Sequence, residues 1–221
     1  MPPRIPSKSL LSIYRRLLAA HGPRHWWPAE SRFEVLVGAV LTQNTAWSNV
    51  EKAIGNLKQA GLLSLDGLLG EAPDELAALI RPAGYFNLKA ARLGNLCRFL
   101  RRHGDIDGLA GLDTALLRQR LLGVNGVGPE TADDILLYAF ERPVFVIDAY
   151  TRRILSRYGL IAGDEPYESL RLGIQEALPE DVTLFNEYHA LIVHHSKYFC
   201  KVKALCPGCP LGRGCKRRMV S

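Results

Sequence analysis

The sequence has little that would indicate a membrane, repeat or β-sheet protein. No apolar run approaches the roughly 18 residues that a membrane-spanning helix needs. No low-complexity tract or internal repeat is visible, and the first residues lack the pattern of a secretory signal peptide. Strand-like alternation is nearly absent, because residues 144–147 are the single β-rich run and are too short and isolated for a sheet. We therefore expect an intracellular protein without a membrane segment, built almost entirely of helices.

The chain has fewer acidic than basic residues. The chain has 28 Lys and Arg against 22 Asp and Glu, a formal net charge of +6. Basic residues cluster at 98–103 and at 152–157. This balance favours a polyanionic partner such as nucleic acid, although a solvated helix face would show the same clusters. With 221 residues, 48% of them hydrophobic, the chain can bury one large domain or two small ones.

Apolar residues recur at helical spacing along nearly the whole chain. Gly, Pro or Asp residues separate these stretches. Because segments near both ends flank a continuous helical middle, we expect an all-α protein in which one domain is split between the two termini. The expected helices cover residues 8–21, 32–41, 46–60, 73–81, 87–103, 113–121, 129–141, 148–158, 166–178 and 183–199.

Four of the five cysteines lie near the C-terminus, at Cys200, Cys206, Cys209 and Cys215. Their spacing, C-x5-C-x2-C-x5-C, puts four thiolates on one short loop-rich segment, which suits a [4Fe–4S] cluster because it takes one cysteine per iron. A zinc site is one alternative, but zinc sites usually combine two CxxC knuckles and only one is present. Disulfides are another alternative, but they suit small secreted domains. Cys97 stands alone on an apolar helical stretch and is expected in the core.

The segment LLGVNGVGPETADDILLYA, residues 121–139, predicts two helices joined by a hairpin. Gly126 and Gly128 permit positive φ and the close approach of another backbone, and Pro129 suits the first turn of the second helix. The hairpin would present free backbone N–H groups at a helix N-terminus, an arrangement that suits a phosphate. A plain corner between two helices would also use glycine here, so the segment after the hairpin decides its meaning.

An aspartate, Asp148, follows the second helix in the segment RPVFVIDAYTRRIL. The hairpin, the helix and this aspartate, in that order, strongly resemble the helix-hairpin-helix DNA glycosylases of the endonuclease III superfamily. The C-terminal cysteines resemble that family's cluster loop, whose usual spacing, C-x6-C-x2-C-x5-C, has one more residue in its first gap. The resemblance implies a six-helix barrel domain over residues 32–142, with the helix-hairpin-helix at 121–136. It also implies an iron–sulfur cluster domain built from residues 1–31 and 143–221.

By this resemblance Asp148 is the catalytic carboxylate. Glycosidic cleavage develops positive charge on the sugar, and a fixed carboxylate stabilises that charge and can orient water. The residues alone also suit Asp148 as the N-cap of the following helix, a structural role that does not exclude catalysis.

Glu130 stands where bifunctional members of the family carry a lysine, whose amine forms a Schiff base with the sugar before strand cleavage. Because a carboxylate cannot form an imine, we expect a monofunctional glycosylase that uses water. Glu130 then serves either as an acid at a helix N-terminus or as a polar contact in the base pocket.

The three tryptophans, Trp26, Trp27 and Trp47, are candidates for the walls of a base pocket. Tryptophan pairs are more often core residues. However, the LTQNT-aromatic pattern and GPETADDILLYA are similar to the 3-methyladenine branch of the superfamily, which uses an aromatic-rich pocket and lacks the lyase lysine. An N3-alkylated adenine is cationic and is therefore attracted to an electron-rich ring face.

Further residues are expected on the DNA. Gln43 matches the family glutamine that fills the space left by the extruded base, and its structural alternative is helix capping or polar packing in the core. Phe86 and Asn87 match a loop that wedges into the opposite strand, although they would also suit a plain loop between helices. The hairpin residues expected to contact the backbone are Gly126, Val127, Gly128 and Thr131.

The function expected from these features is a base-excision-repair DNA N-glycosylase that releases an alkylated purine such as 3-methyladenine. Its partner would be double-stranded DNA with a damaged base, and the enzyme would be a monomer in the cytoplasm, on the nucleoid in a prokaryote. One alternative is a bifunctional glycosylase and AP lyase for oxidised pyrimidines, with another lysine as nucleophile. A second alternative is a non-catalytic iron–sulfur protein that binds DNA damage.

Overall fold

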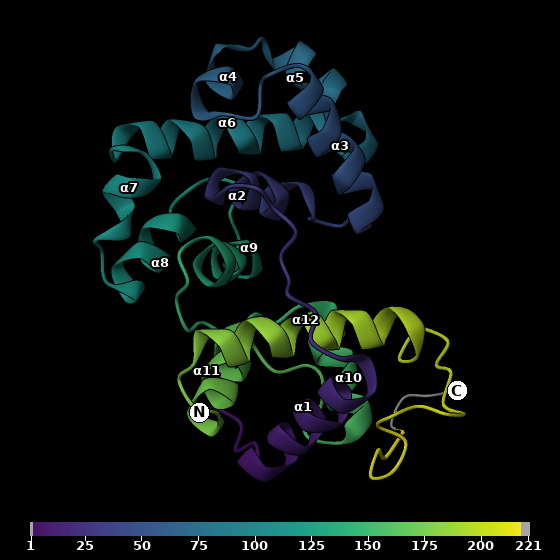
Figure 1. Ribbon diagram of the computed structural model, residues 1–221. Coiled ribbons are helices and arrows are strands. Elements are labelled where there is room, and N and C mark those ends of the chain that lie inside the picture. The colour runs from purple at the N-terminus through teal and green to yellow at the C-terminus, as the bar shows by residue number, and fades with distance from the viewer. Residues whose placement is uncertain (1, 218–221) are drawn as a thin grey trace. The chain divides into compact units, whose positions relative to one another are not determined.

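The computed structural model describes residues 2–217, which form helices and no strand (Figure 1). The expectation of an all-α protein is therefore confirmed. No helix in this part of the chain is both long and apolar enough to cross a membrane. In chain order the helices are α1 (Ser7–His21), α2 (Arg32–Leu41), α3 (Trp47–Gln59), α4 (Leu65–Gly70), α5 (Pro73–Leu79), the 3-10 turn η1 (Arg81–Ala83), α6 (Phe86–Arg102), α7 (Asp105–Ala110), α8 (Thr114–Leu122), α9 (Pro129–Asp134), the π-helical η2 (Ile135–Ala139), α10 (Ala149–Tyr158), α11 (Tyr167–Ala177) and α12 (Val182–Tyr198).

Two of these helices, α4 and α7, are not among the expected ones. Each has six residues, which is too short for a helical period to show in the sequence. Their starts have local causes instead: the Ser64 side chain accepts a hydrogen bond from the Gly67 N–H, and Gly104 adopts a left-handed conformation before α7. All the expected helices are present, and their ends lie within two residues of the expected positions.

The described chain divides into two compact units. Ala29–Arg142 makes the middle unit, and the described residues on either side of it make the other, called the split unit. In the split unit α12 packs on both α1 and α10. The Tyr188 ring lies edge-on to Phe145, and its hydroxyl donates to the Leu10 carbonyl at 2.9 Å. The β-rich run at 144–147 is therefore an extended core segment, fully buried, rather than part of a sheet.

In the middle unit α2 is the central helix. Residues 34–41 are all buried, and α2 contacts α3, α6, α9 and η2. The long helix α6 packs on α4 and α5 (Figure 1). Cys97 on α6 is buried as expected, and burial raises the pKa of its thiol to about 12. This cysteine is an inert core residue.

The hairpin between α8 and α9 requires glycine at one position in particular. Gly126 has φ of 97°, and a Cβ placed there would lie 2.3 Å from Cγ of Arg92. A side chain at 126 is therefore excluded by both backbone conformation and space. The hairpin also has its own backbone bond, from the Val127 N–H to the Val124 carbonyl at 3.0 Å.

Candidate functional site

Asp148 caps α10. Its Oδ1 accepts a hydrogen bond of 2.6 Å from the Thr151 N–H, as the N-cap interpretation requires. Its Oδ2 lies 3.5 Å from Nε2 of His189 on α12. The Asp148 side chain is only 11% exposed. One carboxylate oxygen is thus used in capping, while the other faces an imidazole.

The surroundings of Asp148 favour its charged form. Burial is the largest influence and by itself would raise the pKa, but the interactions with His189 and with the Thr151 N–H more than offset it. The pKa of Asp148 is therefore below its usual value, and the group is an anion at neutral pH. A buried carboxylate held ionised is suited to stabilising positive charge that develops beside it.

His189 is a site residue that the sequence does not single out. It lies on an apolar stretch of α12, and no spacing pattern links it to an aspartate in a different helix. Its side chain is 6% exposed. Only the packing of α12 on α10 brings the two together.

Gln43 lies in a hydrogen-bond network with the hairpin. Its Nε2 donates to the Gly126 carbonyl at 3.0 Å and to Oγ1 of Thr131 at 2.9 Å. Its Oε1 accepts from Nη1 of Arg92. The structure thus brings together three residues expected on the DNA, Gln43, Gly126 and Thr131, and adds Arg92, which no motif indicates.

Lys89 ties the turn after α2 to the turn before α6. Its Nζ donates to the Leu41 carbonyl at 2.8 Å, to Oγ1 of Thr45 at 2.8 Å and to the Ala83 carbonyl at 2.7 Å. Burial, with a smaller effect from Arg92, lowers the pKa of Lys89 to about 8. The amine is fully buried and its three protons have acceptors, so it is a structural group.

The turn before α6 exposes two apolar side chains besides the expected Asn87. Tyr85 is 69% exposed in a left-handed conformation, with φ of 45°, and Leu88 is 49% exposed. Phe86, expected as the wedge, is half-buried, and the Arg81 guanidinium lies 5.6 Å from its ring centroid. Asn87 is exposed as a wedge residue would be. The apolar groups that reach solvent here are therefore Tyr85 and Leu88.

The three tryptophans are all half-buried. Trp26 and Trp27, in the split unit, have ring centroids 6.1 Å apart. The Lys197 ammonium lies 5.7 Å from the Trp26 centroid, so this ring already has a cation over its face. Trp47, in the middle unit, is the first residue of α3.

Around the start of α9 the expected residues differ in exposure. Glu130 is exposed in the first turn of the helix, where a carboxylate interacts favourably with the helix dipole. Gly128 is exposed as the N-cap, whereas Val127 and Thr131 are buried. Val127 therefore offers its backbone rather than its side chain to any partner.

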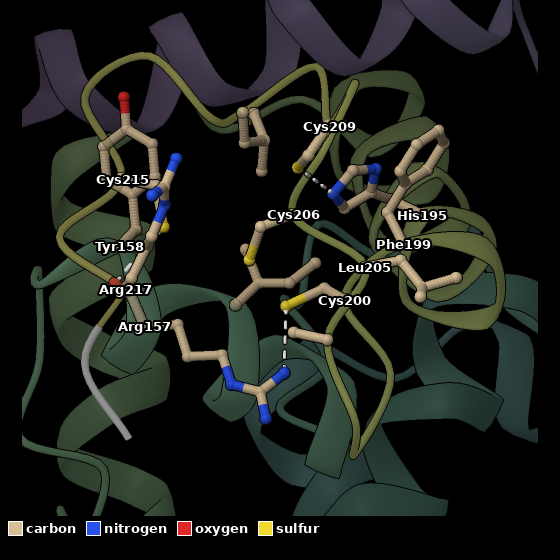
Figure 2. A pocket seen from close by; sticks show the side chains of 13 residues that line it. Arg157, Tyr158, His195, Phe199, Cys200, Leu205, Cys206, Cys209, Cys215 and Arg217 are labelled. Atoms are coloured by element: carbon tan, nitrogen blue, oxygen red, sulfur yellow. Dashed lines mark hydrogen bonds between the residues drawn. The ribbon is translucent and has the colours of Figure 1, made fainter. Parts of the chain in front are cut away.

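The four C-terminal cysteines line one cavity in the split unit, and Figure 2 shows their side chains around it. Its other lining residues come from α10, from the end of α12 and from the loop itself; they include Ile154, Tyr158, Phe199, Leu205 and Leu211. In the described chain no three His, Cys, Asp or Glu side chains form a group suited to one metal ion.

Two nitrogen groups approach the thiols. Arg157 Nη1 lies 3.5 Å from Sγ of Cys200, and His195 Nε2 lies 3.5 Å from Sγ of Cys209 (Figure 2). His195 Nδ1 is 3.1 Å from Nε2 of His21. Burial lowers the pKa of His195 to about 4, so the imidazole is neutral at pH 7. A neutral imidazole with Nδ1 accepting from His21 would donate from Nε2 to the sulfur.

Arginines anchor the cysteine loop through its backbone. Arg157 donates to the Lys201 and Val202 carbonyls, and Arg153 donates to the Cys200 carbonyl at 2.7 Å. Arg16 on α1 donates to the carbonyls of residues 210 and 213. The loop has no regular structure of its own, so these side chains from α1 and α10 hold its path.

Residues 37–180 match the family described as HhH-GPD superfamily base excision DNA repair protein. The chain belongs to this superfamily. It is 50% identical over 209 residues to MJ1434 of Methanocaldococcus jannaschii, provisionally named a DNA repair glycosylase, with 93% of this chain and 95% of that one covered. Endonuclease III of Thermotoga maritima is 30% identical over 83% of this chain and 82% of its own.

Solved structures of HhH-GPD proteins share this fold. The Helicobacter pylori 3-methyladenine DNA glycosylase MagIII, bound to 1,N6-ethenoadenine, has a TM-score of 0.71 and 32% identity, covering 86% of this chain and 95% of its own. A non-covalent endonuclease III–DNA complex has a TM-score of 0.83 over 96% of this chain and 95% of its own, at 22% identity. This HhH-GPD protein is thus a base-excision-repair DNA glycosylase.

Proposed function

We propose that this glycosylase hydrolyses the N-glycosidic bond of an alkylated purine, with Asp148 as catalytic carboxylate and without lyase chemistry. The observation that carries the proposal is the buried Asp148 anion, whose two oxygens face the Thr151 N–H and His189. MagIII, a 3-methyladenine glycosylase whose structure contains 1,N6-ethenoadenine, is 32% identical to this chain. This identity supports an alkylated purine as the substrate.

The proposed chemistry follows from charge. As the glycosidic bond breaks, positive charge develops on the sugar, and the Asp148 carboxylate stabilises it and orients the attacking water. His189 acts as a positioning residue, because it keeps the carboxylate ionised and limits its rotation. An N3-alkylated adenine leaves as a neutral base from a cationic precursor, so the reaction needs no strong general acid.

The pocket tryptophans contribute unequally in this proposal. Trp27, in the split unit, and Trp47, in the middle unit, are each candidates for a ring on which an extruded base stacks. Trp26 is a weaker candidate for a cationic base, because Lys197 already lies over its ring and would repel a second cation.

The absence of a lyase step is proposed from Glu130. A carboxylate cannot attack the sugar to give an imine. Lys89 is no substitute, although its pKa of about 8 is low for a lysine, because its amine is buried and donates to three acceptors.

On the DNA, we assign strand insertion to the turn before α6. Tyr85 and Leu88 are the exposed apolar groups there, and apolar wedges between bases bend a duplex. Asn87 would contact the DNA beside them, and the Phe86 ring would pack against the Arg81 guanidinium and support the turn. The backbone N–H groups of Gly126 and Gly128 would bind a phosphate beside Val127, whose own N–H donates to the Val124 carbonyl, and Gln43 would fill the gap left by the base.

Cys200, Cys206, Cys209 and Cys215 would hold a [4Fe–4S] cluster. Four thiols around one cavity suit a cluster that takes one cysteine per iron, and Arg157 and His195 suit its anionic sulfur atoms. When bound, the cluster supplies a rigid centre for the loop and an electron-transfer group. The middle unit would be the six-helix barrel domain, and the split unit the cluster domain.

The test is base release from matched duplexes that contain 3-methyladenine, 1,N6-ethenoadenine, thymine glycol or uracil, with and without alkali. We expect release of the alkylated adenines, leaving abasic sites that break only after alkali. Preference for thymine glycol would refute the substrate class.

A bifunctional reaction is the second candidate, because relatives named endonuclease III match over most of the chain. Borohydride traps an enzyme–DNA imine. We expect little trapping in the wild type and a gain in Glu130→Lys. Efficient trapping by the wild type would favour the second candidate.

A further inference from the structure

An open groove of about 400 Å³ lies in the middle unit between the C-terminal half of α6 and the start of the hairpin. Its floor includes the buried Phe99 and Val124, and its polar lining includes Asn95, Arg102, His103 and Arg120. None of its lining residues is acidic. A groove with two permanent cations and no carboxylate is suited to an anion.

The two arginines of the groove have N–H groups that are available to a ligand. Arg102 uses Nε on the Arg98 carbonyl at 3.2 Å, which leaves its terminal nitrogens for a ligand. Arg120 makes no side-chain hydrogen bond or ion pair with any residue in the described part of the chain. By contrast, Arg101, next to Arg102 on the same helix, is paired with Asp66.

The groove is fixed to the hairpin. Asn95 Nδ2 donates to the Asn125 carbonyl at 3.0 Å, and Arg98 Nη2 donates to Asn95 Oδ1 at 2.7 Å. The hairpin residue that borders the groove, Asn125, directly precedes Gly126, the first residue of the expected phosphate-binding backbone. A DNA strand held at that backbone would therefore have its next phosphates close to Arg120 and Arg102.

We propose that this groove is a second phosphate site, in which Arg102 and Arg120 bind the sugar–phosphate backbone of DNA beyond the hairpin. The inference rests on the proposed function, since it takes the hairpin as the first backbone contact. The site reads no base sequence, because guanidinium contacts to phosphate carry none. Its effect is to lengthen the bound segment and so to raise affinity for the duplex.

The test compares the double variant Arg102→Gln/Arg120→Gln with the control Arg101→Gln, which removes a neighbouring charge that is already paired. The probe is an undamaged duplex, and its affinity is measured across a range of salt concentrations. Each lost phosphate contact lowers the slope of log K against log salt by about 0.9, so we expect a drop of about 1.8 in the double variant and little change in the control. Ethylation of the phosphates that contact Arg102 and Arg120 should weaken binding by the wild type and leave binding by the double variant unchanged.

Single-turnover excision at saturating DNA separates this proposal from the proposed function. We expect the double variant to excise at the wild-type rate once DNA saturates it. Salt slopes that are equal in wild type and double variant would overturn the phosphate site, even if excision proceeds normally. If the slope and ethylation results are as expected but no alkylated base is released by any form, the phosphate site stands and the proposed substrate falls.

Discussion

The two units hold their functional side chains by different means. In the middle unit, Gln43 and Lys89 bond to backbone carbonyls and hydroxyls, so the hairpin and the neighbouring turns are fixed by geometry. In the split unit, Asp148 faces an imidazole and the cysteines face Arg157 and His195. A substitution in the split unit should therefore change a charge state, and with it rate, pH dependence or metal content. A substitution in the middle unit should change the affinity for DNA.

The strongest test of this contrast is Asp148→Asn. Asparagine caps a helix about as well as aspartate, so folding and DNA binding should persist. Loss of the carboxylate should lower single-turnover base release by at least about 100-fold, since its proposed role is to stabilise charge that develops in the transition state. Asp181→Asn is the matched control, because Asp181 caps α12 through the Leu184 N–H and is not placed in the site. Equal rates in both variants would make Asp148 a helix cap alone.

The second-largest effect is expected when a C-terminal cysteine is replaced, because this should alter the split unit and leave the middle unit unchanged. Cys206→Ser is expected to lose most of about four irons per chain and the absorbance at about 400 nm. Proteolysis should then begin in the loop at 200–217, which the proposed cluster would hold in place, while Ala29–Arg142 stays resistant. Cys97→Ala should keep the iron, because Cys97 is a core residue of the middle unit. Stoichiometric zinc without colour in the wild type would refute the cluster.

His189→Gln should have an intermediate effect, about 10-fold on base release. Because His189 lowers the pKa of Asp148, its loss should raise that pKa. The carboxylate would then protonate at a higher pH, and the acid limb of the rate–pH profile should move upward. A lower rate with an unmoved acid limb would mean that His189 only packs against α10.

The smallest effect is expected for the link between the turn after α2 and the hairpin. Gln43→Ala and Arg92→Met should each weaken binding to a duplex with an abasic site by about 5-fold. Because the two side chains bond to each other, the double variant should lose little more than the worse single variant. Losses that simply add would show that Arg92 does not act through Gln43.

The features that sequence predicts well are those set locally. Helical periodicity gives the long helices, and an aspartate before a helix gives the cap at Asp148. Helices α4 and α7 are not predictable in this way, because six residues carry too little pattern and their starts depend on a serine cap and a left-handed glycine.

The features that sequence does not give are those made by packing between helices. His189 meets Asp148 only because α12 lies on α10, and Arg92 meets Gly126 only because α6 lies against the hairpin. The turn at 84–88 is found by its motif, but the left-handed conformation of Tyr85 decides which side chain reaches solvent. The exposed aromatic ring of this segment, Tyr85, is therefore not evident from the sequence, and the DNA contacts expected of Phe86 and Asn87 stay predictions.

The buried amine of Lys89 gives the middle unit an unusual response to alkali. Its pKa of about 8 in the folded protein lies below its ordinary value of 10.5, so between these values the unfolded chain binds more protons than the folded one. Stability must then rise with pH across that window as far as Lys89 is concerned. Urea unfolding at pH 8 and pH 10 should show this gain in the wild type and not in Lys89→Met. The buried Cys97 thiol acts in the opposite direction above its ordinary pKa of 9.0, because the folded protein keeps that proton longer than the unfolded chain, so the difference between wild type and Lys89→Met isolates the share of Lys89.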